Sequence, residues 1–446
     1  MKVKVISRSD QRYTSTTPGA VAPILKNRDP KLHPFQVERE YVRALNATKL
    51  QRVFAKPFIA ALQGHNDGVC ALATHKSRLN LAASGACNGE IRLWNLSSHN
   101  TLWSSLAHSG WVRDVSFSRC NNFILSASDD KSLKFWSLKD PSPSPVRTLL
   151  SSNQLYSVDS SWDTENPCYA TAGSNGVVEI WSDQTADPIQ TFKWGDDTLT
   201  HVRFNPSETN LLLTTGYDRS LTLMDTRQET PLRRVTMEMR NNQVAWIPSE
   251  PMNFLAANED SNVYLYDMRN LKRSLAVFKD HMGPVLSVSP CPTGRFFVSG
   301  SYDKTVRIWN MKSTKSADVY HTQRMQRIFA VQYSMDANFV LSGSDDGCVR
   351  LWKAKASDSL KPLTKREEDS RQYSTALINK FKDVPELSSI RRKRHLPKLI
   401  HKQRIERHEE NQRLRKKRQN VVRHSKPGTV PKLKPEKEKK IVGVQE

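Results

Sequence analysis

The sequence lacks any segment typical of a membrane anchor or a secretory signal. No run of 18 apolar residues occurs in the 446-residue chain, and its first ten residues, MKVKVISRSD, contain no apolar core. Cysteine is scarce: the chain has only six cysteines. None of them forms a Cys-x-x-Cys pair. We therefore expect buried free thiols in the reducing cytosol or nucleus rather than disulfides or zinc ligands. These cysteines are Cys70, Cys87, Cys120, Cys168, Cys291 and Cys348.

Catalytic motifs are absent as well. The chain has no glycine-rich phosphate loop, no His-Glu-x-x-His and no Gly-x-Ser-x-Gly. Adjacent carboxylates occur at Asp129-Asp130 and Asp345-Asp346, but both pairs fall in predicted hairpin turns, where aspartate caps backbone amides. We predict a protein that is not an enzyme and that uses no cofactor, metal or small-molecule substrate.

A repeat organises most of the chain. The segment SGSYDKTVRIW, which ends at Trp309, has small polar residues, a turn at Asp, and then alternating polar and apolar residues. This pattern predicts two strands joined by a hairpin turn, with one buried face. Seven such segments occur, and their last residues are 42 to 45 positions apart. These last residues are Trp94, Trp136, Trp181, Met224, Tyr266, Trp309 and Trp352.

Three repeats also contain a histidine 28 or 29 residues before the tryptophan, at His65, His108 and His281. Together with the turn aspartate and the tryptophan, this arrangement resembles the WD40 family, which implies an all-β, seven-bladed β-propeller. The resemblance also implies a hydrogen-bonded network in each blade, so these side chains are expected to be structural. The second and sixth repeats contain the full set: His108, Asp130, Trp136, His281, Asp303 and Trp309.

The two ends of the repeat region are predicted to join. Residues 57–62 read as a strand with no neighbour in their own repeat, whereas the last repeat stops at its third strand near Trp352. We expect the early strand to complete the seventh blade, because a closed ring has no open sheet edge at the junction.

Positive charge is concentrated at the two ends of the chain. The net charge is +23, yet residues 57–352 hold 28 Lys and Arg against 29 Asp and Glu. We therefore predict a basic N-terminal arm (1–56), a neutral propeller (57–352), a helical basic extension (353–425) and a disordered Lys/Pro-rich tail (426–446). The basic ends predict polyanionic partners, and without an apolar anchor nucleic acid is favoured over membrane.

Two turns after the third strand of the fourth and fifth repeats have the same pattern. They read Asp225-Thr226-Arg227 and Asp267-Met268-Arg269. Both resemble the Asp-x-Arg element of WD40 substrate receptors of cullin-4 ubiquitin ligases. That resemblance implies that Arg227 and Arg269 contact the ligase adaptor while Asp225 and Asp267 hold the turns. The alternative is that each pair only stiffens its own loop.

Aromatic residues near the repeat boundaries are further candidates for contacts with partners. Trp103, Trp111, Tyr156 and Trp194 lie where loops reach the rims of the predicted ring. Exposed aromatic side chains there would be interaction anchors, and the alternative is packing within the protein.

The C-terminal extension is helical and strongly basic. Residues 364–382 place Tyr373, Leu377 and Phe381 four positions apart, a narrow apolar stripe suited to docking, and a second helix is predicted up to about His424. The basic side chains are suited to RNA phosphates or to a nuclear import signal, and import alone or chromatin binding are the alternatives. These residues are Arg391, Arg392, Lys393, Arg394, Lys398, Lys402, Arg415, Lys416, Lys417 and Arg418.

Three features together resemble one family: the start MKVKVISR, the paired Asp-x-Arg turns and the stretch RRKRHLPKLIHK at 391–402. They are similar to the Sof-type WD40 family of the small-subunit processome. The resemblance implies a nucleolar ribonucleoprotein scaffold that supports processing of pre-ribosomal RNA toward 18S rRNA, with processome proteins and pre-rRNA or small nucleolar RNA as partners. It also implies that animal members serve as cullin-4 receptors.

Overall fold

The computed structural model of the chain describes residues 18–19, 35–120, 122–139, 142–163, 167–195, 197–426, 428–430 and 434–445. Most of the predicted N-terminal arm, including the start MKVKVISR, lies outside these residues. The chain divides into two compact units. One contains residues 55–358 and 394–446, and the other contains residues 1–54 and 359–393.

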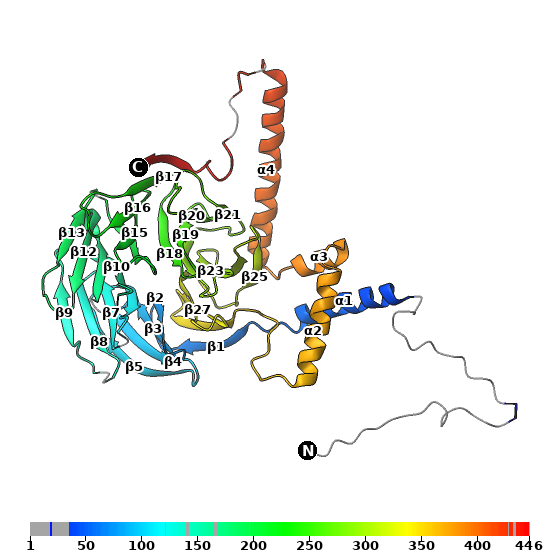
Figure 1. Cartoon of the computed structure of the whole chain (residues 1–446), viewed down its shortest axis with the longest axis horizontal. Helices are drawn as coiled ribbons and strands as arrows, with labels where there is room; N and C mark the ends of the chain where they lie inside the picture. Colours follow the sequence, from blue (N-terminus) through cyan, green and yellow to red (C-terminus); the bar gives the residue numbers. More distant parts are fainter. Residues whose placement is uncertain are drawn as a thin grey trace. The chain divides into compact units, whose positions relative to one another are not determined.

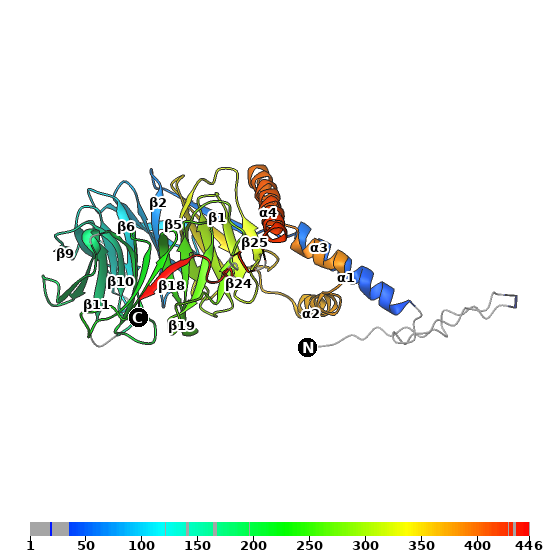
Figure 2. The same cartoon turned by 90° about the horizontal axis from the view of Figure 1, so that it is seen from above.

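The larger unit is a seven-bladed β-propeller, as predicted, with antiparallel sheets arranged around a centre (Figures 1 and 2). Blade one contains β2 (Val69–Thr74), β3 (Leu81–Ala86), β4 (Glu90–Asn95) and β5 (Asn100–Leu106). Blade two contains β6 (Val112–Phe117), β7 (Phe123–Ser128), β8 (Ser132–Ser137) and β9 (Arg147–Leu150). Blade three contains β10 (Leu155–Ser160), β11 (Cys168–Gly173), the 3₁₀ turn η3 (Ser174–Gly176), β12 (Val177–Ser182) and β13 (Gln190–Lys193).

Blades four to seven follow the same order. Blade four contains β14 (Leu199–Phe204), β15 (Leu211–Gly216), β16 (Ser220–Asp225) and β17 (Arg233–Met237), and blade five contains β18 (Asn241–Ile247), β19 (Glu250–Asn258), β20 (Val263–Asp267) and β21 (Ala276–Phe278). Blade six contains β22 (Val285–Pro290), β23 (Phe296–Ser301), β24 (Val306–Asn310) and β25 (Ser316–Tyr320). Blade seven contains β26 (Ile328–Tyr333), β27 (Phe339–Ser344) and β28 (Cys348–Lys353).

The hairpin turn between the second and third strands explains the recurrent Asp or Asn. Each turn places a residue directly after that Asp or Asn in the left-handed region, such as Lys304 at a φ of 64° and Gly347 at 73°. A non-glycine residue is tolerated there because the preceding carboxylate accepts the amide two residues ahead, as Asp303 does from Thr305 at 3.0 Å. The aspartates therefore have a turn-forming role even in blades without the histidine.

Hydrophobic cores lie between neighbouring blades. Each of the seven propeller clusters joins residues of two adjacent sheets, as where Val340 and Trp352 of blade seven meet Val298 and Ile308 of blade six. Inner strands are also bonded across blades, because the Ser287 hydroxyl accepts the Val331 amide at 3.0 Å. Each blade is thus stabilised mainly by its two neighbours.

The ring is closed by a strand from before the first repeat. β1 (Phe58–Gln63) pairs with β28, with Leu62 opposite Val349, and completes the four-stranded sheet of blade seven. The predicted closure is confirmed. Leu62 is buried in the cluster shared by blades seven and one, next to Leu351 and Trp94.

The described residues of the smaller unit form three helices. α1 (Gln36–Val53), α2 (Lys365–Lys380) and α3 (Pro385–Arg392) bury Ala44, Leu377, Ile378 and Leu387 against one another. α2 begins with a capping box between Thr364 and Glu367. The predicted apolar stripe of α2 thus docks on a helix of the same chain. The arm and extension are consequently not the separate segments predicted, because α1 and residues 359–393 form one compact unit.

The C-terminal part of the chain returns to the propeller. α4 (Lys398–His424) is followed by β29 (Ile441–Gln445), which pairs with β17 as a fifth strand of blade four. The prediction that residues 426–446 form a disordered tail was wrong for this strand, because the buried Ile441 and the strand edge order a segment that composition alone marks as polar and basic. Among the described helices, none is both long enough and apolar enough to cross a membrane.

Closure by β1 gives a test of the fold. Leu62→Ala is expected to lower the unfolding free energy by about 2–5 kcal/mol, because it leaves a cavity in the core between blades seven and one. Leu106→Ala changes a leucine that is 74% exposed on an outer strand, and a change within about 0.5 kcal/mol is expected. Urea unfolding followed by tryptophan fluorescence measures both, and equal losses would contradict this account of closure.

Candidate functional site

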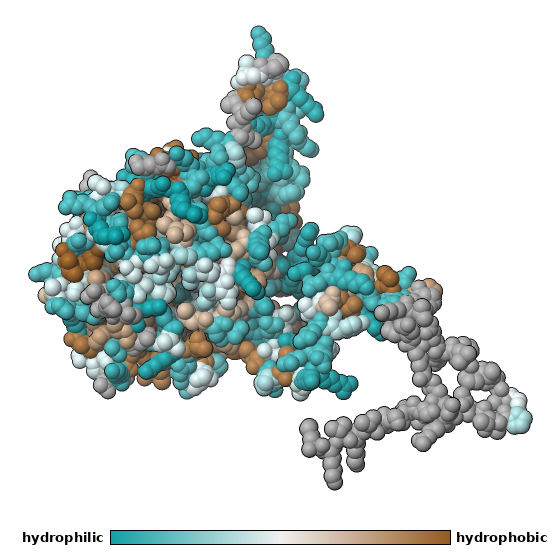
Figure 3. All heavy atoms as spheres, in the orientation of Figure 1, coloured by the Kyte–Doolittle hydropathy of each residue, from teal (hydrophilic) through white to brown (hydrophobic). Residues whose placement is uncertain are grey.

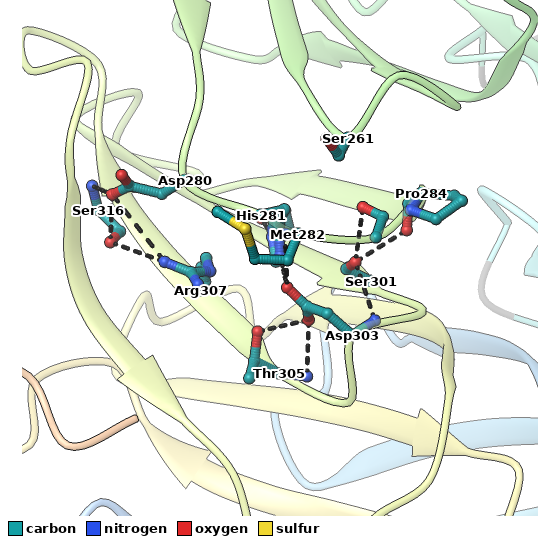
Figure 4. A network of polar contacts seen from close by, with 12 residues as sticks. Ser261, Asp280, His281, Met282, Pro284, Ser301, Asp303, Thr305, Arg307 and Ser316 are labelled. Atoms are coloured by element: carbon teal, nitrogen blue, oxygen red, sulfur yellow. Dashed lines mark hydrogen bonds and ion pairs between the residues drawn. The ribbon is translucent and has the colours of Figure 1, made fainter. Parts of the chain in front are cut away.

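The predicted blade network is present in blades two and six. In blade six, His281 Nδ1 lies 2.9 Å from Asp303 (Figure 4). Its Nε2 lies 2.7 Å from the Ser299 hydroxyl, which also accepts the Trp309 indole N–H at 2.7 Å. In blade two, His108 lies 2.8 Å from both Asp130 and Ser126, and Trp136 donates to Ser126 at 3.0 Å. All these polar groups use one another as partners, so the arrangement holds strands together and leaves no reactive group exposed.

Blade one builds the same network with a different acid. His65 bonds Ser84 at 2.6 Å and Glu90 at 3.1 Å, and Trp94 donates to Ser84 at 2.7 Å. The sequence analysis missed Glu90 because it stands two residues after the turn residue Asn88, where its longer side chain reaches back to the histidine. Blades three and seven keep only the bond from tryptophan to the hydroxyl, at Trp181–Thr171 and Trp352–Ser342.

Both predicted Asp-x-Arg turns have the same local geometry. Asp225 accepts the Arg227 backbone amide at 3.0 Å and its guanidinium at 3.1 and 3.2 Å. Asp267 accepts the amide of Arg269 at 2.9 Å and its guanidinium at 3.1 and 3.0 Å. Each guanidinium is held in a forked contact while the Arg227 and Arg269 side chains stay 67% and 69% exposed. The turns therefore present two oriented cationic groups to solvent.

The two turns are positioned by side chains from the preceding blades. The sequence analysis named Trp194 only as a candidate anchor for partners and did not identify Arg233. The Trp194 indole, which follows β13, donates to the Glu229 carbonyl at 2.7 Å in the turn after Arg227. Arg233 of β17 donates to the Met268 carbonyl at 3.1 Å and also to the carbonyl of Arg269. Each outer strand thus fixes the next blade's turn, and the two guanidinium groups are held by the framework of the ring.

These turns and the histidine network lie on opposite faces of the propeller. In an antiparallel meander, the turn between the third and fourth strands lies at the other end of the blade from the turn between the second and third. We call the end that carries Arg227 and Arg269 the arginine face, and the end that carries His108 and His281 the histidine face. A partner on one face therefore leaves the other accessible.

α4 is anchored to the histidine face by its first turns. Arg407 donates to the His281 carbonyl at 3.1 Å and to the Ser261 hydroxyl at 3.3 Å, in blades six and five. Just before the helix, the His395 ring stacks on His321 at 5.3 Å, and in the first turn of α4 the Ile400 side chain is buried. Beyond Arg407, every residue to the end of α4 is exposed except the half-buried Arg418.

The predicted basic residues are consequently divided between the two units. Arg391, Arg392 and Lys393 lie with the helical unit at the end of α3. Arg394 approaches Asp318 at 3.8 Å, and Lys402 approaches Glu406 at 3.8 Å. The exposed half of α4 carries the densest group, at Arg413, Arg415, Lys416, Lys417 and Arg418, and the helix surface is largely hydrophilic (Figures 1 and 3).

The candidate aromatic anchors differ in their surroundings. Trp103 packs against Trp136 at 5.1 Å, and Trp194 stacks on Phe192 at 5.3 Å, so both pack within the protein. Trp111 is half-exposed, and the Arg113 guanidinium lies 4.7 Å from its ring and 5.1 Å from that of Tyr156.

A central cavity of about 730 Å³ is lined by three pairs of arginine and aromatic residues. Besides Arg113 with Trp111, they are Arg240 with Tyr217 and Arg327 with Tyr302, at 4.7 and 4.3 Å. The sequence held a signal for this cavity, because Tyr217 and Tyr302 both directly precede the turn aspartate of their repeats.

All six cysteines are free thiols, but only Cys291 is buried, so the expectation of burial was wrong for the others. Cys70 lies at the bulge of β2, Cys168 and Cys348 begin strands, Cys87 follows β3, and Cys120 lies in the turn between β6 and β7. In the described part of the chain, no group of three or more His, Cys, Asp or Glu side chains is placed to hold a metal ion.

Comparison with known proteins agrees with this architecture. Residues 56–95, 100–137, 272–310 and 318–353 match the model of the WD domain, G-beta repeat, which defines the class as WD-repeat propeller proteins. The unmatched residues 138–271 contain blade three, which lacks the histidine, together with blade four and most of blade five, in which Met224 and Tyr266 replace the tryptophan. Residues 354–441 match the Sof1-like domain.

The sequence is similar to those of curated relatives over nearly their whole length. Proteins named "DDB1- and CUL4-associated factor 13" are 43% identical over 450 residues in Danio rerio and 43% over 448 residues in Homo sapiens, covering 100% of both chains in each case. The Dictyostelium discoideum protein of that name is 43% identical over 437 residues, or 97% of both chains. The chain belongs to the Sof1-like WD40 family, a family of typically non-catalytic scaffolds.

The buried histidines predict a dependence of stability on pH. Burial lowers the pKa of His108 and of His281, although the neighbouring aspartates oppose this shift. Below about pH 6.5 the unfolded chain therefore binds more protons than the folded chain, so the unfolding free energy falls with decreasing pH. Each such histidine contributes up to ~1.4 kcal/mol per pH unit in that range.

We expect the His108→Asn/His281→Asn variant to be less stable at pH 7.5, because the network is broken, but to lose less stability between pH 7.5 and 5.5 than the natural chain. Urea unfolding at several pH values measures the slope. His401→Asn, at an exposed position of α4, is the control and should keep the natural slope. Unchanged slopes in the double variant would show that other groups govern the acid sensitivity.

Proposed function

We propose that this chain is a non-catalytic scaffold of nucleolar ribosome biogenesis that supports processing of pre-rRNA toward 18S rRNA within the small-subunit processome. The observation that carries the proposal is the exposed, cationic half of α4, anchored at Arg407 to a propeller that is itself close to neutral. Membership of the Sof1-like family supports the same role. Its partners are then processome proteins together with pre-rRNA or small nucleolar RNA, and its location is the nucleus and nucleolus.

The form of α4 is suited to phosphate contact without base recognition. A single helix exposed on all sides gains little from burial, so it is stabilised best by a partner that neutralises its charge. No Phe, Tyr or Trp occurs after Phe381, so the side chains that stack on single-stranded bases are missing. Arg413, Arg415, Lys416, Lys417 and Arg418 therefore bind RNA through its backbone, with an affinity that depends strongly on salt.

Reversing the charge of α4 tests this role. In cells, the variant with Glu at 413, 415, 416, 417 and 418, fused to an unrelated nuclear import signal, is expected to lose nucleolar retention and accumulate 18S precursors. In vitro, the slope of log affinity against log salt should fall by about 4, because up to five phosphate contacts are lost. The control variant exchanges Arg for Lys and Lys for Arg at the same five positions and should behave like the natural chain.

The added nuclear import signal separates this proposal from the alternative in which the basic residues serve nuclear import alone. Normal retention and normal 18S maturation in the charge-reversed, import-restored protein would contradict the RNA role. Crosslinking in cells distinguishes chromatin, because DNA rather than pre-rRNA would then be recovered with the natural chain.

A second function is favoured by the arginine face. We propose that Arg227 and Arg269 also bind the adaptor of a cullin-4 ubiquitin ligase, with the chain as substrate receptor. Two oriented guanidinium groups in consecutive blades, held by Asp225 and Asp267, support this role, and so does the name of the relatives, DDB1- and CUL4-associated factor 13. Because α4 lies on the histidine face, adaptor binding leaves the RNA-binding helix accessible, and the two functions are compatible.

The Arg227→Ala/Arg269→Ala variant is expected to abolish co-purification of the adaptor while the melting temperature stays within about 2 °C, since neither guanidinium is buried. Arg233→Ala should weaken the interaction less, because it loosens the second turn but leaves both groups in place. Arg415→Ala/Arg418→Ala removes the same charge from α4 and should leave adaptor binding intact. Undiminished adaptor recovery with the first variant would refute this assignment.

A further inference from the structure

The outer edge of blade four differs from the edges of the other blades. In the part of the chain that the structure describes, it is the one blade with a fifth strand, and that strand is the chain's own end. β29 pairs antiparallel with β17, with Val444 opposite Val235 and Ile441 opposite Met237, and a bulge interrupts the register at Val442. The ladder continues one residue further, where the Glu238 amide donates to the Lys440 carbonyl at 2.9 Å.

Side chains make this contact selective. Ile441 is buried in the hydrophobic cluster shared by blades four and five, and Val444 packs against that cluster. Val442 lies between them but is 68% exposed. The edge therefore takes up two branched apolar side chains, three positions apart, while main-chain hydrogen bonds hold the backbone between them.

Polar contacts just before β29 fix its register. The Lys437 carbonyl accepts the Ser274 amide at 3.1 Å and the Ser274 hydroxyl at 3.0 Å, and Glu436 pairs with Lys279 at 2.9 Å. Lys440 pairs with Glu238. Glu436 thus faces a basic group on blade five, and Lys440 faces an acidic group on blade four. A shift in the pairing of β29 with β17 would separate both charge pairs.

The segment that leads to β29 is otherwise loosely attached. Between Arg407 and Ile441, no described residue is buried. The contact of β29 is therefore independent of the contact of α4 on the histidine face, and it rests on a short ladder, the buried Ile441 side chain and the polar contacts of residues 436–440.

We propose that the outer edge of blade four is a strand-binding site for an extended peptide with two branched apolar residues three positions apart, preceded by Lys and Glu. Residues 436–445 occupy this site in the intact chain. The site is separable from its ligand: when the chain's own end is removed, the same peptide binds in trans. Because β17 also carries Arg233, occupancy of the site stiffens the strand that holds the turn of Arg269.

The test uses a chain lacking residues 434–446 and a fluorescein-labelled peptide of that sequence, KPEKEKKIVGVQE. Fluorescence anisotropy should show saturable binding to the truncated chain and at least about tenfold weaker binding to the full chain, whose site is filled. The peptide with Ile441→Asp should lose at least about tenfold in affinity, because a carboxylate would enter the core. The peptide with Val442→Asp has the same charge and should lose less than about threefold.

Equal binding to the full and truncated chains, equal affinities of the two substituted peptides, or no binding at millimolar peptide would each overturn the proposal. A second measurement does not depend on the truncated chain. In the full chain, Ile441→Asp should speed hydrogen exchange of the Glu238 amide, which donates to the Lys440 carbonyl, by at least about tenfold, and Val442→Asp should not. Identical exchange in both variants would also overturn it.

Discussion

The propeller depends on the pairing of β1 with β28. Each blade buries its side chains against its neighbours, so the stability of the ring is shared among seven contacts between adjacent sheets. If blade seven lacked its outer strand, the cluster between blades seven and one would lose Leu62 and an open edge would remain. Closure by residues from before the first repeat therefore links the two ends of an array of about 300 residues through a single short strand.

This constraint explains which features of the repeat are fixed and which vary. The turn residue is Asp or Asn in every blade because it supports a left-handed residue directly after it. The histidine and the tryptophan vary. Blade three keeps only the bond between Trp181 and Thr171, whereas Met224 in blade four and Tyr266 in blade five replace the tryptophan, and all three blades are folded. Local backbone geometry thus imposes a stricter requirement than the buried network, which a blade can replace by apolar packing with its neighbours.

The sequence predicted the parts of the molecule that repeat. Period, alternation and turn residues predicted seven blades and closure, because they report on contacts local to each blade. The same local logic located the turns of Arg227 and Arg269. Their supports, Trp194 and Arg233, come from preceding blades, and a contact between residues about 35 positions apart leaves no periodic signal.

Segments outside the repeat were harder to place for a physical reason. The partner of α2 is α1, more than 300 residues away in the chain, and neither helix has a pattern that specifies the other. β29 follows a stretch of lysines, and its five residues gain order only because β17 offers an unpaired edge and a place for Ile441. Composition describes what a segment can do alone, whereas these elements are ordered by surfaces elsewhere in the chain.

α4 and the Asp-x-Arg turns lie on opposite faces of the propeller, so one scaffold can contact two kinds of partner at separate surfaces. A closed propeller is stiff, so a ligand on the arginine face is not expected to reposition Ser261 and His281, to which α4 is anchored. The connection that does run between the faces is covalent, because the chain leaves α4, crosses blade five at Ser274 and ends on β17. The C-terminal strand therefore joins the cationic helix to the strand that carries Arg233, while the contacts of β29 and of α4 with the propeller remain independent of each other.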